Sequence, residues 1–170
     1  ESLIKLISCD VCGNNDLISV LNLGHHPLCD DLIRFGDDST NKEYPIEILF
    51  CNRCKTAHQK YQIPKEILFP ETYHYRTKAT AVVLNGLRDL VNEFILDYGS
   101  VSELKVLDIG CNDGSLLDIF KEKGAHTYGV EPTSSAYEAM INHEVIKDFF
   151  HDEIAEELKF RCGSFDIITL

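Results

Sequence analysis

The fold is decided by one stretch of the chain, Val106-Leu107-Asp108-Ile109-Gly110-Cys111-Asn112-Asp113-Gly114-Ser115. Residues 105–109 have the composition of a buried strand, and a helix is predicted over residues 115–123. Gly110 and Gly114 allow the backbone to turn sharply and to lie close to a ligand. The loop is not the dinucleotide fingerprint G-x-G-x-x-G, because Asn112 stands at its second glycine and the last glycine comes one residue early.

Strand and helix patterns alternate on the C-terminal side of this loop. Strands are predicted over residues 127–130, 144–146 and 165–170, and helices over residues 134–142 and 152–158. An amphipathic helix over residues 79–98 precedes the first strand, and Gly99 ends it. This alternation predicts an α/β domain with a parallel sheet and helices on both faces.

Acidic residues follow three successive strands of the predicted sheet. Asp108 stands two residues before Gly110, and a carboxylate at that place suits a ligand with a positive charge. Glu131 ends the second strand, where nucleotide-binding folds place the acceptor for the ribose hydroxyls. Asp148 follows the third strand and could accept a hydrogen bond from an exocyclic amine, while Phe149 could cover a base.

These features together predict a pocket for S-adenosylmethionine, an adenosine with a cationic amino-acid tail. An unrelated α/β domain is the alternative. The predicted cofactor-binding residues are Asp108, Gly110, Asn112, Gly114, Glu131, Asp148 and Phe149.

The N-terminal part contains two pairs of cysteines with metal-ligand spacing, Cys9-x-x-Cys12 and Cys51-x-x-Cys54. Two residues between ligands let both sulfurs of a pair reach one ion, so the two pairs offer the four corners of a tetrahedral Zn²⁺ site. Such a closed site holds a fold together and does no chemistry. Two disulfides or four buried thiols without metal are the alternatives, and His58 could replace one sulfur, although we expect it on the solvated surface.

Composition and charge limit the kinds of partner. The 170 residues include 16 Lys and Arg against 28 Asp and Glu, for a net charge of −12, which disfavours nucleic-acid binding. No stretch approaches the ~18 apolar residues of a membrane span, and no signal peptide is visible. The seven cysteines then indicate a reducing, cytoplasmic location. The net charge is −2 over residues 1–78 and −10 over residues 79–170, which predicts a zinc-binding domain with a linker followed by a cofactor-binding domain.

The order of these motifs resembles a known family, the zinc-containing C-methyltransferases that use S-adenosylmethionine to modify nucleotide-linked deoxy- or ketosugars. The cysteine pairs look like the zinc-binding domain of that family, and Tyr73-His74-Tyr75 is similar to its Y-x-Y motif. The loop 108–115 and Gly129-Val130-Glu131-Pro132 resemble its cofactor motifs. The resemblance implies a Rossmann-like methyltransferase domain, a nucleotide-linked sugar substrate, and a role for Tyr75 at the acceptor.

Members of the family are about twice as long, and their proposed acid and base groups come after the fourth strand. A sheet that ended on the apolar strand 165–170 would leave an exposed edge. We therefore expect a sequence that is truncated after about four strands, with the general base beyond residue 170. Two alternatives are a non-catalytic zinc-knuckle interaction module with a degenerate α/β domain, and a methyltransferase with another small-molecule acceptor.

Overall fold

The computed structural model describes residues 3–29 and 31–170, and the chain forms two compact units, Glu1–Leu68 and Phe69–Leu170. The charge pattern predicted a boundary after residue 78, whereas the structure divides between Leu68 and Phe69. The difference arises because the backbone N–H groups of Thr77 and Lys78 donate to the side chains of Asn112 and Asp113. These contacts attach residues 69–78 to the second unit, and a count of charges along the sequence does not detect them.

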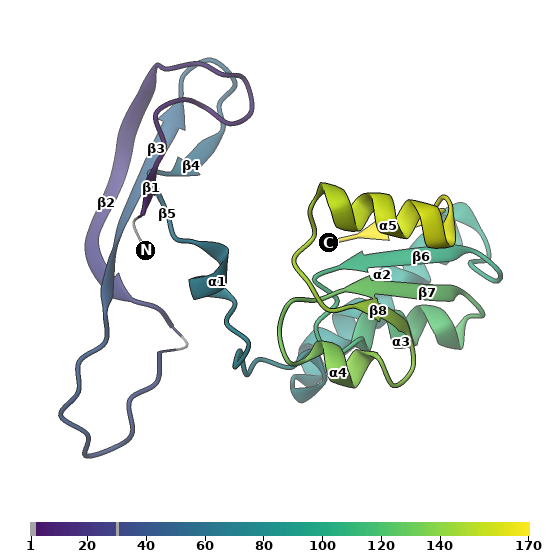
Figure 1. Cartoon of the computed structure of the whole chain (residues 1–170). Helices are drawn as coiled ribbons and strands as arrows, with labels where there is room; N and C mark the ends of the chain where they lie inside the picture. The colour runs from purple at the N-terminus through teal and green to yellow at the C-terminus, as the bar shows by residue number, and fades with distance from the viewer. Residues whose placement is uncertain (1–2, 30) are drawn as a thin grey trace. The chain divides into compact units, whose positions relative to one another are not determined.

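The first unit is built from antiparallel strands (Figure 1). A two-stranded ladder and a three-stranded sheet are followed by one short helix. The two-stranded ladder pairs β1 (Ile4–Lys5) with β5 (Tyr61–Gln62); the sheet has the order β2 (Leu17–Pro27), β3 (Glu43–Cys51), β4 (Ala57–Gln59); and the helix is α1 (Lys65–Leu68).

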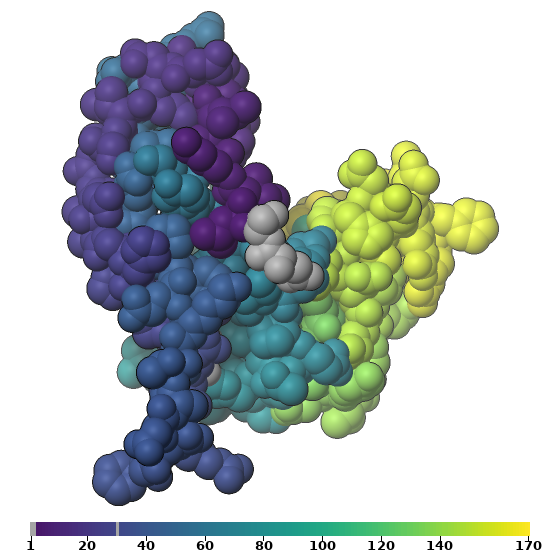
Figure 2. All heavy atoms as spheres, turned by 60° about the vertical axis from the view of Figure 1, so that its left-hand side comes forward, coloured from purple at the N-terminus to yellow at the C-terminus, as the bar shows by residue number. Residues whose placement is uncertain are grey.

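Strand β2 runs up to a proline, where the sequence alone favours a turn. His25 and His26 nevertheless continue β2 and pair with Pro45 and Tyr44 of β3. The pairing with β3 overrides the local turn signal, as is common in sheets, where the neighbouring strand decides the conformation. The loop 31–42 that precedes β3 is largely exposed, as the blue chain in Figure 2 shows.

The second unit contains a four-stranded parallel sheet with the strand order β8-β7-β6-β9, which confirms the predicted α/β class. Its strands coincide closely with the predicted ones, whereas α4 covers only the centre of the predicted helix 134–142. The strands are β6 (Lys105–Ile109), β7 (His126–Val130), β8 (Glu144–Ile146) and β9 (Ile167–Thr169); the helices are η1 (Thr77–Ala79), α2 (Ala81–Tyr98), α3 (Ser115–Glu122), α4 (Ala136–Ala139) and α5 (Asp152–Cys162).

Each face of this sheet has its own apolar core. Val106 of β6 packs with residues of α2 and α3, such as Val91 and Leu117. The next residue, Leu107, points to the opposite face because side chains alternate along a strand, and it packs with Ile154 and Leu158 of α5. Helices α2 and α3 therefore cover one face and α5 covers the other (Figure 1).

The strand order fixes where a ligand can lie. The chain runs from β6 to β7 and β8 on one side, and then crosses to β9 on the other side of β6. At such a switch of direction the loops after the strands separate and leave a crevice at the carboxyl ends. The loop after β6 begins at Gly110, whose φ of +79° lies in the left-handed region that favours glycine.

Among the helices of the described residues, none combines the length and the apolar composition that a membrane crossing needs.

Candidate functional site

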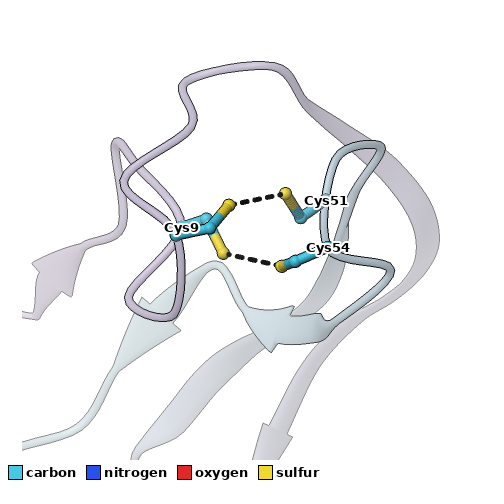
Figure 3. A group of neighbouring side chains, drawn as sticks. Cys9, Cys51 and Cys54 are labelled. Atoms are coloured by element: carbon cyan, nitrogen blue, oxygen red, sulfur yellow. Dashed lines mark hydrogen bonds between the residues drawn. The ribbon is translucent and has the colours of Figure 1, made fainter.

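The four paired cysteines meet at one point of the first unit. The Sγ atoms of Cys9, Cys12, Cys51 and Cys54 all lie within 4.8 Å of one another. Cys9 Sγ is 3.4 Å from Cys54 Sγ (Figure 3), and Cys12 Sγ is 3.6 Å from Cys51 Sγ. A tetrahedral ion with Zn–S bonds of ~2.3 Å would hold its sulfurs about 3.8 Å apart, so the cluster matches a Zn²⁺ site.

The two cysteine turns have the same backbone hydrogen bonds, although they are far apart in sequence. In the first turn Gly13 N donates to Cys9 O, and Cys9 N donates to Asn14 O. In the second turn Lys55 N donates to Cys51 O, and Cys51 N donates to Thr56 O. Gly13 and Lys55 both have positive φ, of 69° and 63°. The two turns are therefore equivalent knuckles, and each presents two sulfurs to the same point.

The surroundings of Cys51 and Cys54 favour the thiolate, the form that binds metal. Hydrogen bonds led by the backbone N–H of Cys54 lower the pKa of the Cys51 thiol to about 6. The Thr56 hydroxyl and amide lower the pKa of Cys54. The pKa of Cys12 is instead raised to about 11, because a backbone hydrogen bond at Asn14 is outweighed by burial and by hydrogen bonds with the other three cysteine sulfurs. His58 is only partly exposed and its Nε2 lies 3.1 Å from Cys9 Sγ, so it contacts the cluster instead of lying on the open surface as expected.

The second unit has an open cavity of about 490 Å³ at the carboxyl ends of its strands. Five of the seven predicted cofactor residues line it, together with the predicted Tyr75: Gly110, Asn112, Glu131, Asp148 and Phe149. Gly110 also has open space where a Cβ would be, since no heavy atom lies within 4 Å of that position. Its polar and aromatic lining suits a nucleoside, and its volume is in the usual range for small-molecule sites.

Glu131 is buried at the end of β7 and holds two loops together. One carboxylate oxygen accepts from Asn112 N at 3.0 Å, and the other accepts from Thr133 N at 2.8 Å and Thr133 Oγ1 at 2.6 Å. A carboxylate has about four acceptor positions, so one remains for a ligand hydroxyl. Sequence analysis did not identify Thr133, although the Pro132-Thr133-Ser134 composition is typical of a turn in which hydroxyls bind nearby backbone.

Asp108 is separate from the cavity lining. It is buried, and its carboxyl accepts a hydrogen bond of 2.7 Å from Thr169 Oγ1 of β9. Burial raises the pKa of this carboxyl, and the nearby Glu131 charge raises it further. Gly114 also lies outside the cavity lining. A Cβ at this position would come within 2.9 Å of His143 Cδ2, so the glycine permits close packing of the loop against His143.

Two sets of aromatic residues line the cavity. Tyr73 and Tyr75 contribute from the segment that precedes η1, and Tyr73 stacks edge-on against Phe69 with ring centroids 5.6 Å apart. Phe149 and Phe150 contribute from the loop after β8. Asp148 is half exposed there, and its Oδ1 accepts from Phe149 N at 2.7 Å.

Comparison with known proteins gives matches in both units. A family model described as "Putative zinc binding domain" matches residues 9–69, and a model described as "Methyltransferase domain" matches residues 74–170. The C-methyltransferase NovU of Streptomyces niveus is 27% identical over 158 residues, which is 91% of this chain and 37% of NovU. The ubiquinone biosynthesis O-methyltransferase of Hahella chejuensis is 29% identical over 90 residues, which is 51% of this chain and 38% of that protein.

Among solved structures, magnesium protoporphyrin IX methyltransferase from Synechocystis PCC 6803 with bound SAH matches with a TM-score of 0.38 and 19% identity. That match covers 61% of this chain and 49% of the other. The chain thus spans well under half the length of the two curated relatives, 37% and 38%.

Replacement of one cluster cysteine should release the metal and unfold the first unit. We expect Cys51→Ser to abolish the zinc content of about one ion per chain, since structural zinc contributes about 10–16 kcal/mol to small zinc domains. Cys29→Ser is the matched control, because Cys29 is exposed and outside the cluster. Elemental analysis gives the zinc content, and amide NMR dispersion reports the fold. Wild-type protein that is folded without metal would contradict this prediction.

Removal of the buried charge at Asp108 should stabilise the second unit at neutral pH. Because burial raises the pKa of this carboxyl, its ionisation opposes folding as the pH rises through the folded pKa. Asp108→Asn keeps an acceptor for Thr169 and removes the charge. Urea unfolding of both proteins should show a more stable variant at about pH 7.5 and a smaller difference at acidic pH, because the wild-type carboxyl takes up a proton as the pH falls. An equal difference at both pH values would refute the electrostatic explanation.

Proposed function

Because this chain belongs to the methyltransferase family, we propose that its second unit binds S-adenosylmethionine in the cavity at the carboxyl ends of β6, β7 and β8. One observation carries the proposal. Residues from the ends of three neighbouring strands, Gly110, Glu131 and Asp148, line a single cavity of about 490 Å³. They lie far apart in the sequence, and their convergence at one edge of the sheet is what a nucleoside site in a doubly wound sheet requires.

The residues of the cavity have distinct proposed roles. Glu131 accepts from the ribose through its remaining acceptor position, and Gly110 leaves space for the ligand beside the backbone. Asp148 accepts from the exocyclic amine, while Phe149 packs against the base. When bound, S-adenosylmethionine supplies a methyl group that is activated by its positively charged sulfur.

The acceptor that we propose is a carbon atom of a nucleotide-linked keto- or deoxysugar. Support comes from the zinc unit, the Tyr73-His74-Tyr75 motif and the loop 108–115 in one chain, and from the similarity to a C-methyltransferase over 91% of this chain. Tyr75 lines the cavity and is 40% exposed, so its hydroxyl can donate a hydrogen bond to the acceptor. We assign no general base within residues 1–170.

The zinc site has a structural role in this proposal. Four thiolates complete the tetrahedral coordination of the ion, which leaves no position for substrate. Among the described residues, Cys29, Cys111 and Cys162 remain as thiols beside the four zinc thiolates, which favours the reducing cytoplasm as the place where the protein works.

A second candidate is methyl transfer to oxygen. It is favoured by the similarity of 90 residues to an O-methyltransferase. The same cavity would hold the cofactor in either case, because the two reactions differ only in the acceptor.

Binding of the demethylated product, S-adenosylhomocysteine, tests the cofactor site. We expect wild-type protein to bind it in calorimetry and Glu131→Gln to bind about tenfold more weakly, since one charged acceptor is lost. Glu156→Gln, an exposed glutamate on α5, is the matched control and should bind as wild type does. If the wild-type protein gives no binding heat and no thermal shift, a non-catalytic interaction module becomes the better description.

The position of the transferred methyl group distinguishes the two acceptors. The full chain is incubated with S-adenosylmethionine that carries a ¹³C methyl group and with a nucleoside-diphosphate ketodeoxysugar. We expect the ¹³C signal of the product to be that of a methyl group bound to carbon, coupled to the sugar skeleton. A methoxy signal would support transfer to oxygen and contradict the carbon acceptor.

A further inference from the structure

The segment 71–78, which we call the strap, forms one wall of the cavity and has no regular structure before η1. Tyr73, Tyr75 and Thr77 of the strap line the cavity that also contains Gly110 and Glu131. An extended wall of this kind needs external contacts, because it makes few hydrogen bonds within itself. The contacts that hold the strap therefore determine the shape of the site.

Arg76 holds the strap to the loop and helix that follow β7. Its Nη1 donates to two carbonyl groups of the strap, Tyr73 O and Tyr75 O, each at 2.9 Å. Its Nε donates to Glu138 Oε1 at 2.6 Å, and its Nη2 donates to Ser134 Oγ at 3.2 Å. The Arg76 side chain is only 20% exposed, so these bonds are shielded from water.

The loop after β6 holds the strap from the other side. Asn112 Nδ2 donates to Tyr75 O at 3.1 Å, and Asn112 Oδ1 accepts from Thr77 N at 3.0 Å. Asp113 Oδ2 accepts from Lys78 N at 3.0 Å. Arg76 and Asn112 thus meet at the carbonyl of Tyr75, and each links it to a loop that also lines the cavity or flanks it.

On the basis of the proposed cofactor site, we infer that Arg76 is a positioning residue that sets the strap, and with it Tyr73 and Tyr75, against the bound nucleoside. Arg76 is itself absent from the cavity lining and acts through the two carbonyl groups. The planar guanidinium of Arg76 can donate through Nη1 to both carbonyl groups while its Nε donates to the Glu138 carboxylate. A lysine ammonium can keep the charge pair with Glu138, but it cannot reproduce this arrangement of donors.

The substitution Arg76→Lys separates the charge pair from the carbonyl bonds. We expect the backbone amides of residues 71–78 to exchange with deuterium about tenfold faster in this variant, because the strap opens locally. We also expect S-adenosylhomocysteine to bind about tenfold more weakly in calorimetry, since part of the binding free energy is spent on ordering the strap.

Arg88→Lys is the matched control. Arg88 lies on α2, is half exposed and pairs with Glu122 at 3.5 Å. Its substitution should leave both the exchange of residues 71–78 and the affinity for S-adenosylhomocysteine unchanged. Thermal unfolding of the two zinc-loaded variants should have similar midpoints, which shows that the effect of Arg76→Lys is local.

Two results would overturn the inference. In one, Arg76→Lys retains wild-type exchange, so that the remaining contacts with Glu138, Asn112 and Asp113 hold the strap without the bonds to the two carbonyl groups. In the other, exchange becomes faster but affinity is unchanged, so that the strap does not contact the ligand. Failure of wild-type protein to bind S-adenosylhomocysteine would instead overturn the proposed function, and the exchange rates would still decide whether Arg76 holds the strap.

Discussion

The parallel pairing of β6 with β7 is the constraint on which the site depends. The register places Asp108 beside Gly129 and Ile109 beside Val130, so both strands end at the same level. Gly110 N then donates to Val130 O at 2.7 Å, and Asn112 N donates to Glu131 Oε2 at 3.0 Å. A shift of this register would separate the glycine loop from the acid of the second strand. The close pairing also needs Gly129, since a Cβ there would lie 2.6 Å from Cys111 Sγ.

Much of this arrangement could be predicted from the sequence, because its signals are local. The strand 105–109, the helix 115–123 and the cysteine knuckles each depend on residues close together in the chain. Parallel sheet topology then brings the strand ends together by a general rule. This is why five separately chosen residues line one cavity.

The remaining features depend on contacts between distant residues, and no local pattern reports them. The length of β2 follows from its pairing with β3, and the side-chain bonds of Asn112 follow from the position of the strap. Sequence analysis gave Arg76 no role, because its partner Glu138 lies 62 positions away. The hydrogen bond between Thr169 and Asp108 forms only because β9 pairs with β6, and amino-acid composition alone does not predict that pairing.

The electrostatics of the second unit explain how the fold accommodates two buried carboxyl groups at the ends of its strands. Asp108 and Glu131 are both buried near the same strand ends, and burial followed by the charge of Glu131 raises the pKa of Asp108. Hydrogen bonds from Thr133 and Asn112 stabilise the Glu131 charge, whereas Asp108 receives a single bond from Thr169. A ligand with a positive charge would lower the pKa of Asp108 again, because an opposite charge nearby favours the carboxylate. The free energy that the protein loses by burying this acid would then favour binding of a cation over a neutral nucleoside of the same shape.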